Sequence, residues 1–259
     1  MTATLKSHSH GHTMVLTISN PDHRNALGPD IYAAGIEALN VAEGSAEVRS
    51  VVIQGEGAHF SAGGNLQRLK ANRELPPQHQ AQSIEGLHNW IETIRAFPKP
   101  VLAAVEGSCA GAGFSLALAC DMIVAANNSV FVMAYTNVGL SPDGGATWSL
   151  MRALPRATAT QLLMAGDRID AARLMALGAV NAVCAAGEAL QEALSLAERL
   201  NNRAPNAMAS IKELCSEAES ASLHQQLASE RDHFVRNLHH ANAGEGIQAF
   251  LDKRPPRYR

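Results

Sequence analysis

The sequence predicts an α/β fold in which short buried strands alternate with amphipathic helices, followed by a region that is almost entirely helical. Apolar runs at residues 48–54 and 101–105 are each followed by a glycine-bearing turn, as is typical of buried strands. Helical spacing of apolar residues separates these runs, which favours α/β organisation. From about Asp170 the helical pattern continues. We therefore expect an α/β core at residues 1–198 and a helical region at residues 199–259.

The composition bounds the class of protein. Of 259 residues, 46% are hydrophobic and 17% charged, which is enough apolar surface for a large core. A net charge of −3 with no run of Lys or Arg argues against nucleic-acid binding. No apolar run approaches the roughly 18–20 residues of a membrane span, and no signal-peptide pattern begins the chain. We expect a cytoplasmic protein whose cysteines are buried, reduced thiols: Cys109, Cys120, Cys184 and Cys215.

The chain begins with a predicted hairpin at residues 5–19. His8, His10 and His12 alternate along it, so that they would share one strand face and could hold a metal ion. Histidines on an edge hairpin are more often simply exposed to solvent. We therefore assign no metal site to this segment.

Two amphipathic helices are predicted in the first half of the chain. One begins at Pro29, because proline suits the first turn of a helix, and continues to about Glu43. The other follows a polar loop around residues 76–77, with Ser83 as its N-terminal cap. It ends before Pro98.

Two segments place glycine and other small residues directly before a helix. They are residues 60–66 and residues 106–114, and the second leads into a predicted helix at residues 114–120. Small residues leave backbone N–H groups open at the positive end of a helix. Two such groups directed at one oxygen would form an oxyanion hole. Either segment alone would fit a close-packed turn equally well.

Taken with their surroundings, these segments resemble the crotonase (enoyl-CoA hydratase/isomerase) superfamily. The resemblance begins at residues 20–27, includes residues 139–145 and ends at residues 245–254, so that it covers nearly the whole chain. It implies a spiral of ββα units with a C-terminal helical region that forms trimers or hexamers. It also implies a CoA thioester as substrate, with no prosthetic group. The thioester carbonyl would be held by the N–H groups of Ala62 and Ala112.

The resemblance also implies which residues bind the CoA portion of the substrate. They are expected to be Arg24, Ala26, Asn65, Leu66, Phe250 and Lys253. The tail motif with Phe250 and Lys253 would come from a neighbouring subunit and close over the nucleotide. Anionic phosphates are bound by Arg and Lys, and both occur where the family places them.

The chain departs from the hydratases of this family at both catalytic glutamates. Those positions are Ser115 and Tyr135, and neither side chain can act as a carboxylate base. Asp143 lies where the isomerases that resemble this segment have their single acid, so we assign it as the acid/base. The string Pro-Asp-Gly would also suit a turn or the N-cap of a helix at residues 144–150. We expect Asp121, after a buried helix, to be structural.

One acid suits double-bond isomerisation, because a single carboxylate can remove a proton at one carbon and return it at another. We expect isomerisation or hydration of an acyl-CoA thioester. Apolar walls formed by Phe60, Phe114 and Tyr135 would raise the pKa of the acid. Trp148 is expected either to line the acyl pocket or to belong to the core. Which acyl group the pocket accepts depends on the conformation of residues 70–85.

Two other functions stay open. Residues 65–66, 114–119 and 131–135 look like those of oxepin-CoA hydrolases from aromatic-acid (phenylacetate) breakdown, whose ring opening begins with addition of water to an activated double bond. The loss of both glutamates would also fit a catalytically inactive acyl-CoA-binding protein. The intact glycine turns argue against such decay.

The C-terminal helices are expected to drive oligomerisation. The segments 188–202, 206–218 and 223–238 carry apolar residues on faces that a single core would leave uncovered. Among these residues are Leu190, Leu194, Leu227 and Phe234.

Overall fold

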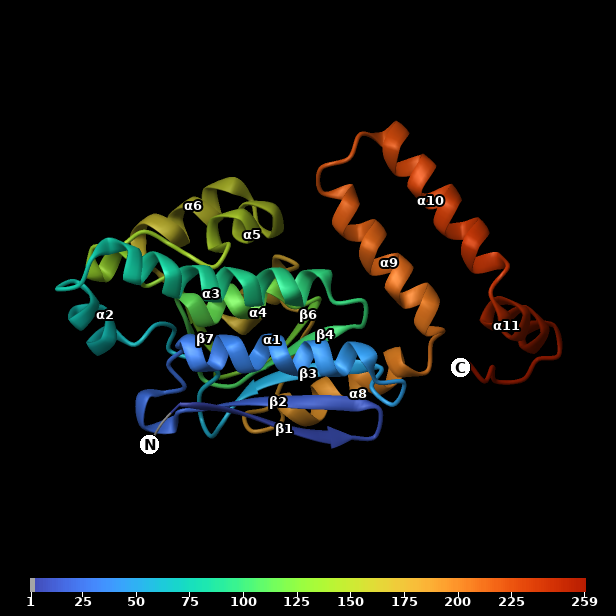
Figure 1. Cartoon of the computed structure of the whole chain (residues 1–259), viewed down its shortest axis with the longest axis horizontal. Coiled ribbons are helices and arrows are strands. Elements are labelled where there is room, and N and C mark those ends of the chain that lie inside the picture. The colour runs from blue at the N-terminus through green and yellow to red at the C-terminus, as the bar shows by residue number, and fades with distance from the viewer. Residues whose placement is uncertain (1–2) are drawn as a thin grey trace.

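The computed structural model describes residues 3–259 and contains two sheets surrounded by helices (Figure 1). The larger sheet has six strands in the order β1 (Thr4–His10), β2 (Thr13–Ser19), β3 (Ser50–Gly55), β4 (Val101–Val105), β6 (Met122–Ala126) and β9 (Ala182–Cys184). Only its β1–β2 pair is antiparallel. The smaller sheet consists of β5 (Ser108–Ala110), β7 (Val130–Val132) and β8 (Arg168–Asp170). The α/β prediction is confirmed.

The central strands are buried on both faces, which is why their sequences are continuous apolar runs. Successive side chains of a strand point to opposite faces. Val51 and Ile53 of β3 face the main core, and Val52 between them faces a second, smaller cluster. Helix α8 (Ala189–Asn201) covers that second face and completes the cluster with Ala193 and Leu194.

Helices α1 (Pro29–Gly44) and α3 (Pro77–Ala96) lie side by side over the main core (Figure 1). Gly35 permits this contact, because a Cβ atom there would lie 2.2 Å from the Trp90 ring. Helix α4 (Ala112–Ala119), which is buried except for the half-buried Leu118, packs against α3. The remaining α-helices that precede α8 in the chain are α2 (Leu66–Asn72), α5 (Ala146–Ala153), α6 (Arg156–Ala165) and α7 (Ala171–Ala176).

Several predicted boundaries are wrong. Helix α3 begins at Pro77, so the predicted loop around residues 76–77 is its start and Ser83 lies inside it. The fixed φ angle of proline suits the first helical position, and this preference outweighed the capping preference of serine. The segment interpreted as a glycine turn contains strand β5, and α4 begins at Ala112. Strand β9 also lies in the region that was predicted to be helical.

Helices α9 (Pro205–Ala218), α10 (Leu223–Leu238) and α11 (Ala241–Leu251) extend away from the sheets (Figure 1). The predicted helical segments 206–218 and 223–238 are confirmed as α9 and α10, and the Ser222 side chain forms a capping box with Gln225. As expected, Phe234 is 68% exposed. The expectation of an uncovered face is wrong for Leu194, which is 7% exposed, and for its partly buried neighbour Leu190, because α8 packs on the sheet.

Two smaller expectations are corrected. Cys109 and Cys120 are buried free thiols, but Cys184 is half-buried and Cys215 is exposed. His12 lies in the turn after β1, where its Nδ1 donates to the carbonyl oxygen of residue 47 at 2.9 Å, so the three histidines do not share a strand. Within residues 3–259 no helix is long and apolar enough to cross a membrane.

Candidate active site

A cavity of about 570 Å³ forms where four distant segments of the chain converge. These segments are residues 62–69, residues 80–88, residues 111–112 and residues 134–145, and Tyr32 of α1 completes the wall. The segment at residues 70–85, whose conformation the sequence left open, is mostly helical. Its α3 portion lines the cavity with Gln80, Ser83 and Ile84.

The two glycine-bearing segments meet at one side of this cavity. Their backbones approach each other so closely there that no side chain would fit between them. A Cβ atom on Gly63 would lie 2.6 Å from the carbonyl oxygen of Ala110, and Gly63 has a left-handed φ of +83°. A Cβ atom on Gly113 would lie 2.7 Å from the Cβ atom of Ser61. Glycine is therefore needed at both positions.

The open backbone donors of this wall belong to Gly64 and Ala112. Among the described residues, neither N–H group has a hydrogen-bond acceptor, and both residues line the cavity. Ala112 is the first residue of α4, at the positive end of that helix. The N–H of Ala62, by contrast, donates to the carbonyl oxygen of Arg24 at 2.9 Å. The expectation for Ala62 is thus corrected to Gly64, two residues further along the same motif.

Asp143 faces the same cavity and is held by the two residues that stand in place of glutamates. The Tyr135 hydroxyl donates to Asp143 Oδ1 at 2.6 Å, and the Ser115 hydroxyl donates to the Asp143 carbonyl oxygen at 3.0 Å. Asp143 does not cap a helix, because α5 begins at Ala146 and no side chain caps it. The capping alternative is therefore wrong.

Tyr135 acts in this site as a donor. Burial raises the pKa of its hydroxyl well above the ordinary value, and the nearby Asp143 carboxylate raises it further. The phenol therefore stays protonated at neutral and mildly alkaline pH. Within the described part of the chain, Asp143 is the only carboxylate that lines the cavity.

The predicted aromatic walls are only partly present. Tyr135 lines the cavity, but Phe60 and Phe114 are fully buried outside it. Trp148 is neither a pocket residue nor a core residue. It is 37% exposed, and the guanidinium carbons of Arg95 and Arg152 lie 4.3 and 4.1 Å from the centroid of its ring. The apolar walls are formed instead by Leu66, Leu69, Ile84, Leu87, Val138 and Leu140.

Of the predicted CoA-binding residues of the first half, Leu66 lines the cavity, and the Arg24 carbonyl oxygen accepts from the N–H of the cavity residue Ala62. Arg24 and Leu66 are exposed, whereas Ala26 is buried. Ala26 and Asn65 line a hollow of about 100 Å³ next to the cavity. The Asn65 side-chain oxygen accepts from two backbone N–H groups of α2, so this residue also caps that helix.

The predicted CoA-binding residues of the tail lie at the opposite end of the molecule from α2 (Figure 1). Phe250 on α11 is 84% exposed, and Lys253 follows that helix with a left-handed φ of +56°. Glu245 fixes this tail, because it accepts two hydrogen bonds from Arg254 and one from the Arg257 N–H. These bonds lower the pKa of Glu245 to about 2. Within one chain, the two groups of residues cannot bind one CoA molecule.

Asp121 lies away from the cavity, in agreement with the structural role expected for it. Its Oδ2 accepts from the Val101 N–H at 2.7 Å and from Lys212 Nζ at 2.8 Å. These bonds join the start of β4 to α9.

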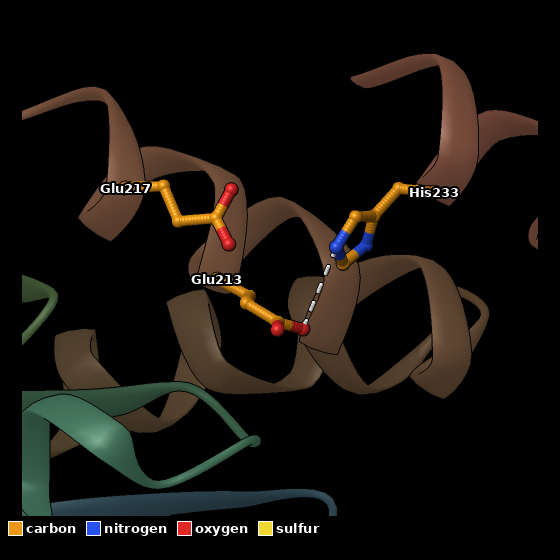
Figure 2. A group of neighbouring side chains, drawn as sticks. All are labelled: Glu213, Glu217 and His233. Atoms are coloured by element: carbon orange, nitrogen blue, oxygen red, sulfur yellow. Dashed lines mark ion pairs between the residues drawn. The ribbon is translucent and has the colours of Figure 1, made fainter. Parts of the chain in front are cut away.

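One group of potential metal ligands occurs among the described residues, between α9 and α10. Glu213, Glu217 and His233 point toward one another there (Figure 2). Arg236 donates to His233 Nδ1 at 2.8 Å, since a guanidinium has no acceptor. A neutral His233 ring must then carry its proton on Nε2, which faces Glu213 at 3.7 Å. A protonated ring nitrogen cannot bind a metal, so we interpret this group as a contact between two helices.

The chain resembles known proteins over nearly its whole length. The sequence profile described as enoyl-CoA hydratase/isomerase matches residues 9–259. The chain is 33% identical over 253 residues to a 1,2-epoxyphenylacetyl-CoA isomerase of Escherichia coli K12, covering 97% of each chain. It is 30% identical to a 2,3-dehydroadipyl-CoA hydratase of that organism, covering 95% of this chain and 94% of the relative. A crystal structure of an enoyl-CoA hydratase from Polaromonas sp. JS666 superimposes with a TM-score of 0.98 at 70% identity, covering 99% of this chain and 100% of that one.

Proposed function

The chain belongs to the enoyl-CoA hydratase/isomerase family and is an enzyme that acts on CoA thioesters, and from this we propose that it moves a double bond within the acyl group. The observation that carries the proposal is the placement of Asp143. Its carboxylate is the one acid among the described cavity residues, and it shares the cavity with the open N–H groups of Gly64 and Ala112.

The two N–H groups would stabilise negative charge on the thioester oxygen. Asp143 would remove a proton from the carbon next to the carbonyl of a 3-enoyl thioester, and the electron pair would delocalise onto that oxygen as a dienolate. The protonated Asp143 would then return the proton to the far carbon of the dienolate, which gives the 2-enoyl thioester. Donors at a developing oxyanion and one positioned acid/base are the two contributions this needs.

The hydrogen bond from Tyr135 supports this role. It holds Asp143 Oδ1, which leaves Oδ2 to exchange the proton with the substrate. Hydration needs one group to activate water and a second group to supply a proton, and Tyr135 already donates to Asp143. A single shuttling acid therefore favours isomerisation over hydration.

A panel of thioesters separates the candidate reactions. Incubation with 3-enoyl-CoA, 2-enoyl-CoA and oxepin-CoA substrates is followed by absorbance and mass. We expect the 3-enoyl thioester to change its spectrum with no change in mass. A gain of one water on the 2-enoyl thioester or on the oxepin would indicate hydration or ring opening instead. Binding without any turnover would indicate an inactive acyl-CoA-binding protein.

We expect the nucleotide of CoA to be closed over by the tail of a neighbouring subunit. Lys253→Glu should weaken CoA binding on the order of tenfold, because a positive charge near the phosphates is replaced by a negative one. Isothermal titration calorimetry with CoA measures this effect. Arg199→Glu, the same change on an exposed residue of α8, is the control and should bind CoA normally. Equal CoA affinity for the Lys253 variant and the wild type would remove Lys253 from the site.

We expect trimers or hexamers in solution. Large apolar side chains of α10 and α11 are exposed in the single chain, namely Leu223, Leu227, Phe234, Leu238, Ile247, Phe250 and Leu251. Covering such faces is a common driving force for oligomerisation. Multi-angle light scattering should therefore give three or six times the chain mass of 27.4 kDa. A mass of one chain at micromolar concentration would contradict this expectation.

A further inference from the structure

The cavity wall contains a cation for which the isomerisation proposed above has no use. Arg68 lies in the first turn of α2 and lines the cavity together with Leu69 and Tyr32. Its Nε is fully buried and has no hydrogen-bond partner. No carboxylate of residues 3–259 lies within 4.0 Å of its guanidinium. Among residues 3–259, therefore, no carboxylate forms a direct ion pair with the Arg68 guanidinium.

Two neighbours hold the guanidinium in this place. Nη1 lies over Gly28, where an added Cβ atom would be 2.7 Å away. Gly28 has extended backbone angles that any residue adopts, and Arg68 supplies the only atoms that such a Cβ would meet. On its other side, the guanidinium lies near the Tyr32 hydroxyl. Burial raises the pKa of that hydroxyl, and Arg68 partly offsets the rise.

The chemistry of the guanidinium indicates what it would bind. A buried charge is costly unless it is paired and hydrogen-bonded. The planar fork of arginine matches a carboxylate, which it can bind through two parallel hydrogen bonds. Asp143 faces the same cavity but is held by Tyr135. The Arg68 guanidinium has no carboxylate partner among the described residues, so it is available to bind an anionic group of the ligand.

We propose that Arg68 binds a carboxylate at the far end of the acyl group, so that the preferred substrates are CoA thioesters of dicarboxylic acids. This inference rests on the proposed function, because it takes the thioester carbonyl to lie at the Gly64 and Ala112 N–H groups. Arg68 and these groups belong to the same cavity, so one acyl chain can reach both. The thioester end would lie at the open N–H groups and the carboxylate end at the guanidinium.

A phosphate of CoA is the other anion that could reach Arg68, since this residue also borders the hollow with Ala26 and Asn65. The placement of Arg68 in the same cavity as the open N–H groups of Gly64 and Ala112 favours the acyl carboxylate. The experiment must therefore separate these two sources of negative charge.

Binding of saturated, unreactive acyl-CoA pairs tests the proposal without relying on turnover. The two members of each pair have equal chain length and end in either a methyl group or a carboxylate. By isothermal titration calorimetry we expect the wild type to bind the carboxylate member of the best-fitting pair about 10- to 100-fold more tightly, as for a charged hydrogen-bonded pair. Arg68→Met should abolish this preference and leave the affinity for the methyl-ended member and for CoA unchanged.

Two further variants complete the test. Lys70→Met removes a positive charge from an exposed residue of the same helix and should keep the preference. Gly28→Ala leaves Arg68 in place but displaces its guanidinium, and should weaken the preference. Arg68→Met should unfold at the same temperature as the wild type or at a higher one, because it removes a half-buried charge that has no ion-pair partner and whose Nε is buried without a hydrogen bond.

Three outcomes would overturn the proposal. The wild type could bind both members of every pair equally. Arg68→Met could weaken CoA and both members alike, which would assign Arg68 to a CoA phosphate. Lys70→Met could lose the preference as fully as Arg68→Met, which would make it a general charge effect. If no CoA compound bound to the wild type at all, the proposed function itself would be wrong.

Discussion

Asp143→Asn is expected to lower turnover by about 10²- to 10⁴-fold, the usual contribution of a positioned acid/base. The amide can still accept the hydrogen bond from the Tyr135 hydroxyl, so the loop should keep its position. It cannot take up the substrate proton. Thioester affinity should barely change, because the open donors of the cavity are backbone N–H groups. Steady-state kinetics with the best 3-enoyl thioester, together with calorimetry, measure both quantities.

Two variants serve as controls for this result. Tyr135→Phe removes the hydrogen bond to Asp143 Oδ1, and Ser115→Ala removes the bond to the Asp143 carbonyl oxygen. Both leave the carboxylate in place, so each should cost less than about tenfold. If Tyr135→Phe lost as much turnover as Asp143→Asn, the phenol would itself be taking part, and the single-acid mechanism would be wrong.

Ala112→Pro is expected to lower turnover by about 10²- to 10³-fold, the cost of losing one donor of an oxyanion hole. Proline has no N–H, and its ring carbon would occupy the space where the oxyanion lies. The fold should tolerate the change, because Ala112 is the first residue of α4 and its N–H has no acceptor among the described residues. Proline is favoured at that position of a helix. Turnover and the thermal unfolding temperature are the measurements.

Ala112→Gly is the matched control, since it keeps the N–H group and removes only the methyl group. It should retain most of the turnover, with a cost of about 1 kcal/mol at most in the stability of the helix. An active Ala112→Pro variant would exclude this N–H from the site. Equal losses of turnover in the two variants would show that the packing of the Ala112 methyl group matters and that its N–H group does not.

The sequence predicted the helices and strands best where a single physical preference decides the outcome. The apolar runs at residues 48–54 and 101–105 became β3 and β4, and the predicted segment 223–238 became α10. Prediction failed where two preferences compete. Pro77 and Ser83 are both suitable helix starts, and the helix begins at the proline, whose fixed φ angle suits the first helical position.

The candidate site was predicted at the level of its motifs but not of its atoms. The motif at residues 60–66 pointed to an open N–H group, but Ala62 uses its own on the Arg24 carbonyl, and that contact depends on tertiary structure. The bond from Tyr135 to Asp143 could likewise not be read from residues eight positions apart in a loop. Arg68 was missed because an arginine in a short helix is usually on the surface. The glycine at position 28, which leaves room for its guanidinium, was the available signal.

Hydrogen exchange at the carbon next to the thioester carbonyl tests the central claim most directly. In D₂O, NMR and mass spectrometry report the rate at which the wild type and Asp143→Asn replace that hydrogen in a bound 3-enoyl thioester. We predict that the wild type introduces deuterium at this carbon or at the far carbon of the dienolate, which receives the returned proton. Asp143→Asn should bind the thioester equally well but exchange at least about 10²-fold more slowly. Equal exchange rates in the two proteins would contradict the assignment of Asp143 as the group that moves the proton.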